Sequence, residues 1–137
     1  MSEAPETLAD KKSGLNPALA LLIAVAAWAV PGLGHLLLWR WRRAIVFFLT
    51  VGTLAFTGVT LRGRLFSPDT GDFFDLLGFL ADCGSGVFFY ATRWIENGGA
   101  DVSRAAGDYG TRFFAAAGVL NLLCALDAFD LAVGGKD

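Results

Sequence analysis

The residues whose types could support chemistry fall into two groups in this 137-residue chain. The first group lies within AWAVPGLGHLLLWRWRRA (residues 27–44), which contains the only histidine of the sequence, His35. An imidazole beside several guanidinium groups could titrate near neutral pH, accept a proton or contact an anion. The residues that shape and charge this stretch are Pro31, Gly32, Gly34, Arg40, Arg42 and Arg43, and the second group, polar residues inside apolar runs, is Thr53, Thr57, Asp82, Ser85, Asn121 and Asp127.

A serine hydrolase site and a nucleotide-binding loop are both disfavoured. Ser85 lies between two glycines in DCGSGV and His35 could act as its base, but the nucleophile-elbow motif needs glycine where this chain has Cys83. PGLGH lacks the third glycine of a dinucleotide-binding loop and a preceding strand. One histidine and two cysteines in apolar runs also argue against zinc or haem. We therefore expect no enzyme, no cofactor and no metal site.

The composition indicates that the elements holding these residues lie in lipid. The chain is 55% hydrophobic and only 18% charged, with a mean hydropathy of +0.54. Soluble domains usually have about 25% charged and about 45–50% apolar residues. The formal net charge of −2 is too small to indicate nucleic acid as a partner.

Four apolar stretches approach the length of about 20 residues that a transmembrane helix needs. They predict an all-α bundle of about four spans in one membrane domain (15–133), after a disordered polar segment (1–14) and before a short tail (134–137). Pro31 is expected to kink or end the first helix at the PGLG motif. No internal repeat is visible in the sequence. The predicted spans are 15–39, 44–61, 72–94 and 109–133.

Three of these spans allow alternatives. The third and fourth carry internal Asp and Asn, so a buried hairpin or a partly interfacial helix is the other interpretation for them. The first resembles a signal peptide, with Ala27-Trp28-Ala29 as the cleavage site, although its polar leader is long and acidic for that role.

Three sets of residues recur at helical spacing: a polar stripe, a stripe of hydroxyls and a face of small residues with one amide. We expect these three faces to lie against one another inside the bundle. Asp82 would then be protonated, or would accept hydrogen bonds from a threonine or Asn121. The alternative is a proton or cation path through Asp82 and Asp127, while a simpler interpretation has Asp127 and Asp130 reaching water or a basic residue near a helix end. The stripes are 75, 78, 82, 85, 89 and 93; Thr50, Thr53, Thr57 and Thr60; and Ala117, Asn121, Ala125, Ala128 and Ala132.

The arginine-rich turn between the first two spans is predicted to lie at the membrane surface. Trp39 and Trp41 suit the headgroup layer, and the arginines suit lipid phosphates. His35 would cap carbonyls freed by the kink, contact a partner or a headgroup, or titrate. By the positive-inside rule the turn faces the cytoplasm, which in a four-span chain places both termini outside.

The segment PGLGHLLLWRWRRAIVFF (31–48) resembles the central motif of the two-transmembrane-helix hairpin domain family. It is more similar still to small uncharacterised bacterial membrane proteins that pair a PGLGH…GRxRRA hairpin with a GxxNLLxxLDAFD helix, here residues 118–130. The chain departs from them at Trp39, where those proteins tend to have glycine, and it lacks the acidic-Arg-Phe turn of the two-helix family. The resemblance implies a multi-span membrane fold and no particular activity.

These observations favour a non-enzymatic, multi-pass protein of the bacterial cytoplasmic (inner) membrane. It would serve as a structural or assembly subunit, as a homo-oligomer or within a larger membrane complex, in contact with lipid and without nucleic acid. The alternatives are a small transporter or ion-conducting subunit that uses Asp82, and a protein that binds anionic headgroups through His35 and the arginine turn.

Overall fold

The computed structural model describes residues 14–68, 71–96 and 105–135, and these residues form helices and no strand. The predicted all-α architecture is confirmed. The predicted disordered leader falls almost wholly outside the described residues, as does the end of the tail. In chain order the helices are α1 (Pro17–Ala29), α2 (Leu33–Leu37), α3 (Trp41–Thr60), α4 (Phe73–Cys83), α5 (Val87–Glu96) and α6 (Ala105–Ala132).

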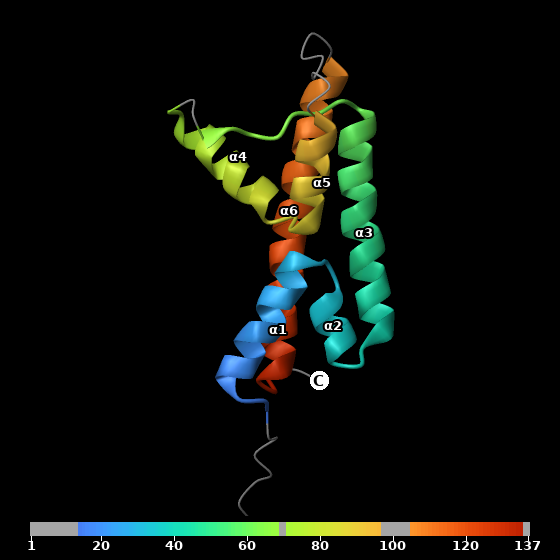
Figure 1. Ribbon diagram of the computed structural model, residues 1–137, viewed down its shortest axis with the longest axis vertical. Helices are drawn as coiled ribbons and strands as arrows, with labels where there is room; N and C mark the ends of the chain where they lie inside the picture. The colour runs from blue at the N-terminus through green and yellow to red at the C-terminus, as the bar shows by residue number, and fades with distance from the viewer. Residues whose placement is uncertain (1–13, 69–70, 97–104, 136–137) are drawn as a thin grey trace, which may run out of the picture.

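Two helices, α3 and α6, run the length of the bundle side by side (Figure 1). At 1.5 Å per residue, the 20 residues of α3 measure about 30 Å, which matches the hydrocarbon thickness of a bilayer. Both helices are long and apolar enough to cross a membrane. A third such span exists among the described residues if the bent pair α4 and α5 is counted as one. The length and apolar composition of these helices are those of a membrane protein.

The first predicted span is a helical hairpin and not a straight helix. Asn16 caps α1 by accepting a hydrogen bond from the Ala18 N–H at 3.0 Å. The helix ends at Ala29 and the chain reverses through Pro31 and Gly32, whose φ of +83° is left-handed. The predicted break at the PGLG motif is thus confirmed, and α2 leads back toward the end where α1 began (Figure 1).

This reversal overturns the expectation that the arginine turn and the termini lie on opposite sides. The start of α1 meets the end of α6, where the Leu15 N–H donates to the Ala132 carbonyl at 2.8 Å. The turn between α2 and α3 lies at that same end of the molecule (Figure 1). The cause is the break after Ala29, because the first stretch returns to its starting side instead of crossing.

The third predicted span is also broken, at residues 84–86, where α4 and α5 meet at an angle of 111°. Gly86 takes a left-handed φ of +61°, and the Ser85 hydroxyl donates to the Asp82 carbonyl at 2.6 Å. The predicted polar stripe from Asp75 to Arg93 therefore lies on two helices that point in different directions. The break agrees with the hairpin that the internal Asp allowed, but this hairpin is not buried, since Asp82 is the buried residue of α4 and most large apolar side chains of that helix are exposed.

The order of elements repeats although the sequence shows no repeat. A hairpin of two shorter helices followed by one long helix occurs first as α1, α2 and α3 and again as α4, α5 and α6. In Figure 1 the first hairpin enters from the lower end of the bundle and the second from the upper end. This is the arrangement of an inverted-topology repeat, which is common in membrane proteins.

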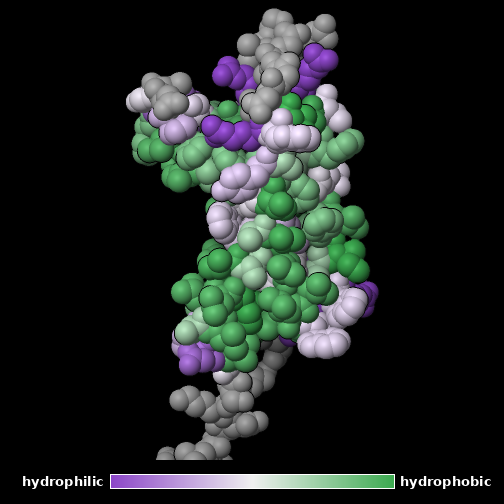
Figure 2. All heavy atoms as spheres, in the orientation of Figure 1, coloured by the Kyte–Doolittle hydropathy of each residue, from purple (hydrophilic) through white to green (hydrophobic). Residues whose placement is uncertain are grey.

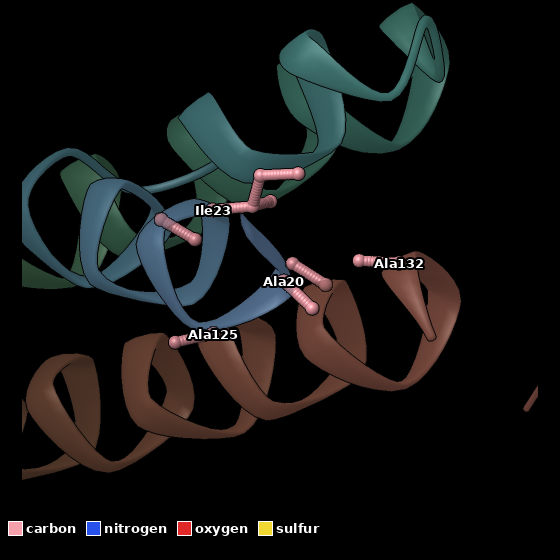
Figure 3. Close-up of a cluster of buried hydrophobic side chains, with 6 residues drawn as sticks. Ala20, Ile23, Ala125 and Ala132 are labelled. Carbon is pink, nitrogen blue, oxygen red and sulfur yellow. The ribbon is translucent and has the colours of Figure 1, made fainter. Parts of the chain in front are cut away.

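Small residues allow the hairpins to pack against α6. One buried cluster joins α1 to the last turns of α6 almost entirely through alanines (Figure 3): Ala20, Ile23, Ala27, Ala125, Ala128 and Ala132. Large apolar side chains instead face outward, and Figure 2 shows them covering the middle of the visible face while polar residues gather toward its ends. A soluble protein would not expose so continuous an apolar surface.

Candidate functional site

The tips of the two hairpins meet in the middle of the molecule. The Trp28 indole N–H donates to the Cys83 carbonyl at 3.1 Å. A Cβ on Gly86 would overlap the Trp28 carbonyl oxygen and would lie 2.6 Å from that of Ala29. The two breaks in the predicted spans are therefore in backbone contact, and only glycine fits at Gly86.

Asn121 of α6 links these two tips. Its amide nitrogen donates to the Trp28 carbonyl and to the Gly84 carbonyl, each at 2.8 Å, and its side chain is fully buried. Broken helices leave terminal carbonyls without intrahelical partners, and inside a membrane no water replaces them. Asn121 therefore supplies donors at the point where both hairpins need them. Asp82 is not its partner, contrary to one of the predicted pairings.

Asp82 is fully buried, and its Oδ2 accepts a hydrogen bond from the Phe66 N–H at 2.7 Å. Phe66 belongs to the extended segment after α3, and its ring lies over Gly78, where a Cβ would overlap it. No threonine of α3 makes this contact. The carboxylate thus ties the segment that joins α3 and α4 to the face of α4.

The threonines of α3 lie on its outer face, which is a correction to the predicted inward stripe. The buried residues of this helix are small and lie on the opposite face: Ala44, Val51, Ala55 and Gly58. Thr50 and Thr57 donate to the carbonyls four residues earlier, at 2.7 and 2.8 Å, and Thr60 donates to the Thr57 carbonyl at 2.9 Å. Thr53 is exposed, and within the described part of the chain its hydroxyl has no hydrogen bond.

The structure brings together His35, Asp127 and Arg43, which are far apart in the sequence. The buried His35 ring places Nε2 at 3.0 Å from Asp127 Oδ2, and Arg43 Nη1 lies 3.5 Å from the same oxygen. Because an ionised carboxylate only accepts, Nε2 carries the proton in this contact. The ring also packs against Phe47, with centroids 4.7 Å apart. His35 therefore contacts the Asp127 carboxylate and does not cap the carbonyls of the kink.

Sequence reasoning missed this pair because it placed the two residues on opposite sides of the membrane. Two signals were present: His35 needs an acceptor in an apolar setting, and both residues lie within the motifs PGLGH and LDAFD. The expectation that Asp127 reaches a basic residue is confirmed. Gly34 lies beside this contact, since a Cβ there would meet Ala27 and Ala128 at 2.6 and 2.9 Å.

The arginine turn forms an open hollow of about 320 Å³ lined by Trp39, Arg40, Trp41, Arg42 and Arg43. Trp39 has a left-handed φ of +60° and is 82% exposed. Glycine adopts a left-handed conformation at the lowest cost, so tryptophan at this position carries a backbone penalty. The turn keeps this conformation here with a tryptophan, whose ring lies 6.3 Å from that of Trp41.

These contacts engage the polar side chains of the site with one another and with the backbone. His35 bonds to Asp127, and the Ser85 hydroxyl bonds to a backbone carbonyl. Within residues 14–68, 71–96 and 105–135, no three His, Cys, Asp or Glu side chains gather as metal ligands would. The arrangement can hold the hairpins together, and it places the arginine guanidinium groups of residues 40–43 at one end of the bundle.

A family model matches residues 22–137, and it describes a family of unknown function, DUF6677. The chain belongs to this family. No curated protein and no solved structure matches the chain. The matched range contains the breaks of both hairpins, Asn121 and the contact between His35 and Asp127, and it begins within α1.

We expect Asp127→Ala to lower the free energy of unfolding by about 1–3 kcal/mol, because it leaves a buried donor on His35 without an acceptor. Unfolding in mixed detergent micelles measures this change. Asp127→Asn is the matched control, since the amide oxygen still accepts from Nε2, and its cost should be clearly smaller. Equal costs for the two variants would mean that the hydrogen bond is not the source.

Proposed function

We propose that the protein is a non-enzymatic integral membrane protein that acts as a structural or assembly subunit and associates with itself through α3. The observation that carries this proposal is the outward hydroxyl of Thr53, which within the described residues has no acceptor. A hydroxyl in hydrocarbon without a hydrogen bond is unfavourable, so a neighbouring helix that accepts from it gains stability.

The surroundings of Thr53 suit a second helix. Thr50, Thr53, Thr57 and Thr60 form what we call the threonine face, and a shallow hollow of about 300 Å³ lies along it, lined by Leu49, Thr50, Thr53 and Leu54. Small side chains let helices approach closely in lipid. The alanine face of α6 is occupied within the chain by α1 and α3.

The location that supports this role is the bacterial cytoplasmic membrane, with a multi-pass topology. The support comes from the apolar surface, from the two long helices and from the resemblance of residues 31–48 and 118–130 to the PGLGH proteins. Placing the arginine turn in the cytoplasm now places the start of α1 and the end of α6 there too.

We expect Thr53→Val to weaken self-association about threefold to tenfold, because one interhelical hydrogen bond per chain is lost. The measurement is energy transfer between chains that carry donor and acceptor fluorescent proteins at the C-terminus, in bacterial inner-membrane vesicles. Thr53→Phe should abolish the signal by bulk. Such fusions fluoresce only if the C-terminus is cytoplasmic, so the same samples test the topology.

Thr50→Val is the matched control, because the Thr50 hydroxyl already bonds to the Val46 carbonyl within α3. It should leave the energy transfer close to that of the natural chain. If Thr53→Val and Thr50→Val behave alike, or if the natural chain fluoresces but gives no transfer, self-association through the threonine face is wrong.

A conducting role through Asp82 is the weaker proposal. A proton or cation path needs an acid that can exchange with both sides, and more than one such group at mid-depth. Asp82 is fully buried and its Oδ2 holds the Phe66 N–H. These contacts support a structural role for Asp82.

A further inference from the structure

We propose that the arginine hollow and an adjoining apolar groove form one binding site for an anionic phospholipid. The arginine hollow is the concavity lined by Trp39–Arg43 described above. The groove lies between α2 and the first turns of α3 and has a volume of about 250 Å³. Its walls include Gly32, Leu33, Leu36, Ala44, Ile45 and Phe48.

The hollow suits the headgroup because it is cationic and lies at one end of the apolar surface. Arg43 is partly engaged by Asp127 at 3.5 Å. In the described part of the chain, no acidic side chain lies within 4 Å of Arg40 or Arg42. Guanidinium groups bind phosphate oxygens in bidentate fashion, and interfacial tryptophans hold the headgroup level.

The groove suits the acyl chain because its walls are apolar and because the hollow lies where the turn between its two walls, α2 and α3, enters α3. Arg43 ends the lining of the hollow, and Ala44 and Ile45 begin the lining of the groove along the same helix. Gly32, which lines the groove, lets the backbone of the tip approach α3 closely: a Cβ there would overlap the Ala44 carbonyl oxygen. One molecule with a charged head and a hydrocarbon tail therefore fills both parts.

The pairing of charge with hydrocarbon distinguishes a phospholipid from a free anion. A soluble phosphate would contact the arginines but would leave the groove to unspecific lipid. A neutral phospholipid would fill the groove but would leave Arg40 and Arg42 less well paired. Leu49 lines both the groove and the hollow on the threonine face, whereas the arginine hollow shares no residue with that face. The headgroup part of the site therefore does not depend on the proposed self-association.

The headgroup part is tested by counting lipids on the full chain by native mass spectrometry after titration with phosphatidylglycerol or phosphatidylcholine of equal acyl chains. We expect one phosphatidylglycerol to bind preferentially, and Arg40→Gln with Arg42→Gln to weaken that binding at least about tenfold. The control pair Arg62→Gln with Arg64→Gln removes equal charge from exposed positions after α3 and should bind like the natural chain. Equal binding of the two lipids, or equal loss in both pairs, overturns the proposal.

The acyl part is tested with tryptophan substitutions that fill the groove. Leu36→Trp places bulk in a groove wall and should weaken phosphatidylglycerol binding severalfold. Leu37→Trp, on the same helix but outside the groove, should not. Soluble glycerol phosphate at millimolar concentration should fail to displace the lipid. Displacement by glycerol phosphate, or identical binding by the Leu36 and Leu37 variants, would show that only a phosphate group is recognised.

Discussion

Gly118→Ala is expected to destabilise the protein by about 3 kcal/mol, although it adds a single methyl group to a helix. The new Cβ would overlap the Ala81 carbonyl oxygen of α4 and would lie 2.6 Å from the carbonyl carbon and 3.1 Å from the Ser85 nitrogen. All of these are backbone atoms, so no side chain can rotate out of the way. The methyl must push the α4–α5 hairpin away from α6.

Gly52→Ala is the matched control because it also replaces a glycine within a long helix. Its Cβ would meet only the Phe88 ring, at 3.4 Å, which is ordinary contact. The gain in helix propensity should leave this variant unchanged or more stable by up to about 1 kcal/mol. Unfolding of the full chain in bicelles measures both. A Gly118→Ala protein as stable as Gly52→Ala would show that α4 does not approach α6 this closely.

Asn121→Ala should lower the free energy of unfolding by about 2 kcal/mol or more. The variant removes both donors that hold the Trp28 and Gly84 carbonyls, and these buried carbonyls have no water to replace them. Interhelical hydrogen bonds in membranes average about 0.6 kcal/mol each when measured singly. The expected loss is larger because one amide serves two helix ends that must meet.

A second measurement on the same variant reports the tips directly. The Trp28 indole donates to the Cys83 carbonyl, so separation of the tips changes the surroundings of this ring. We expect Trp28 emission to shift in Asn121→Ala, in a background where the other tryptophans are phenylalanine. Leu123→Ala, at an exposed position two residues on, is the control. Stability and emission unchanged by Asn121→Ala would contradict the link.

The apolar length of the stretches predicted the two long helices, α3 and α6, because about 20 apolar residues are enough to cross a bilayer as a helix. The prediction of an inward face failed for the threonines of α3, and for three of them the reason is that their hydroxyls, those of Thr50, Thr57 and Thr60, bond to their own helix. Polar side chains that are satisfied locally do not need the interior. Their place was decided by the small residues on the opposite face, which let α3 approach α6.

The candidate site was only half visible in the sequence. His35 and the arginines were recognised as one cluster because they are neighbours along the chain. The partnership of His35 with Asp127 was not, because it depends on which side of the membrane each segment ends. A break of three residues at Val30–Gly32 reverses the first stretch and brings the two motifs to one end.

The sequence by itself determined three features of this protein. Composition indicated a lipid surrounding, apolar length indicated helices, and the geometry of Pro31 indicated where the first helix breaks. Tertiary structure alone decided that the third stretch is also a hairpin, that the two tips meet at Asn121 and that the arginine turn lies at the same end of the bundle as the start of α1 and the end of α6. The physical reason is that a glycine-rich break permits a reversal without requiring one. Close backbone packing at Gly86 and Gly118 selects the reversal, and that packing depends on residues distant in the chain.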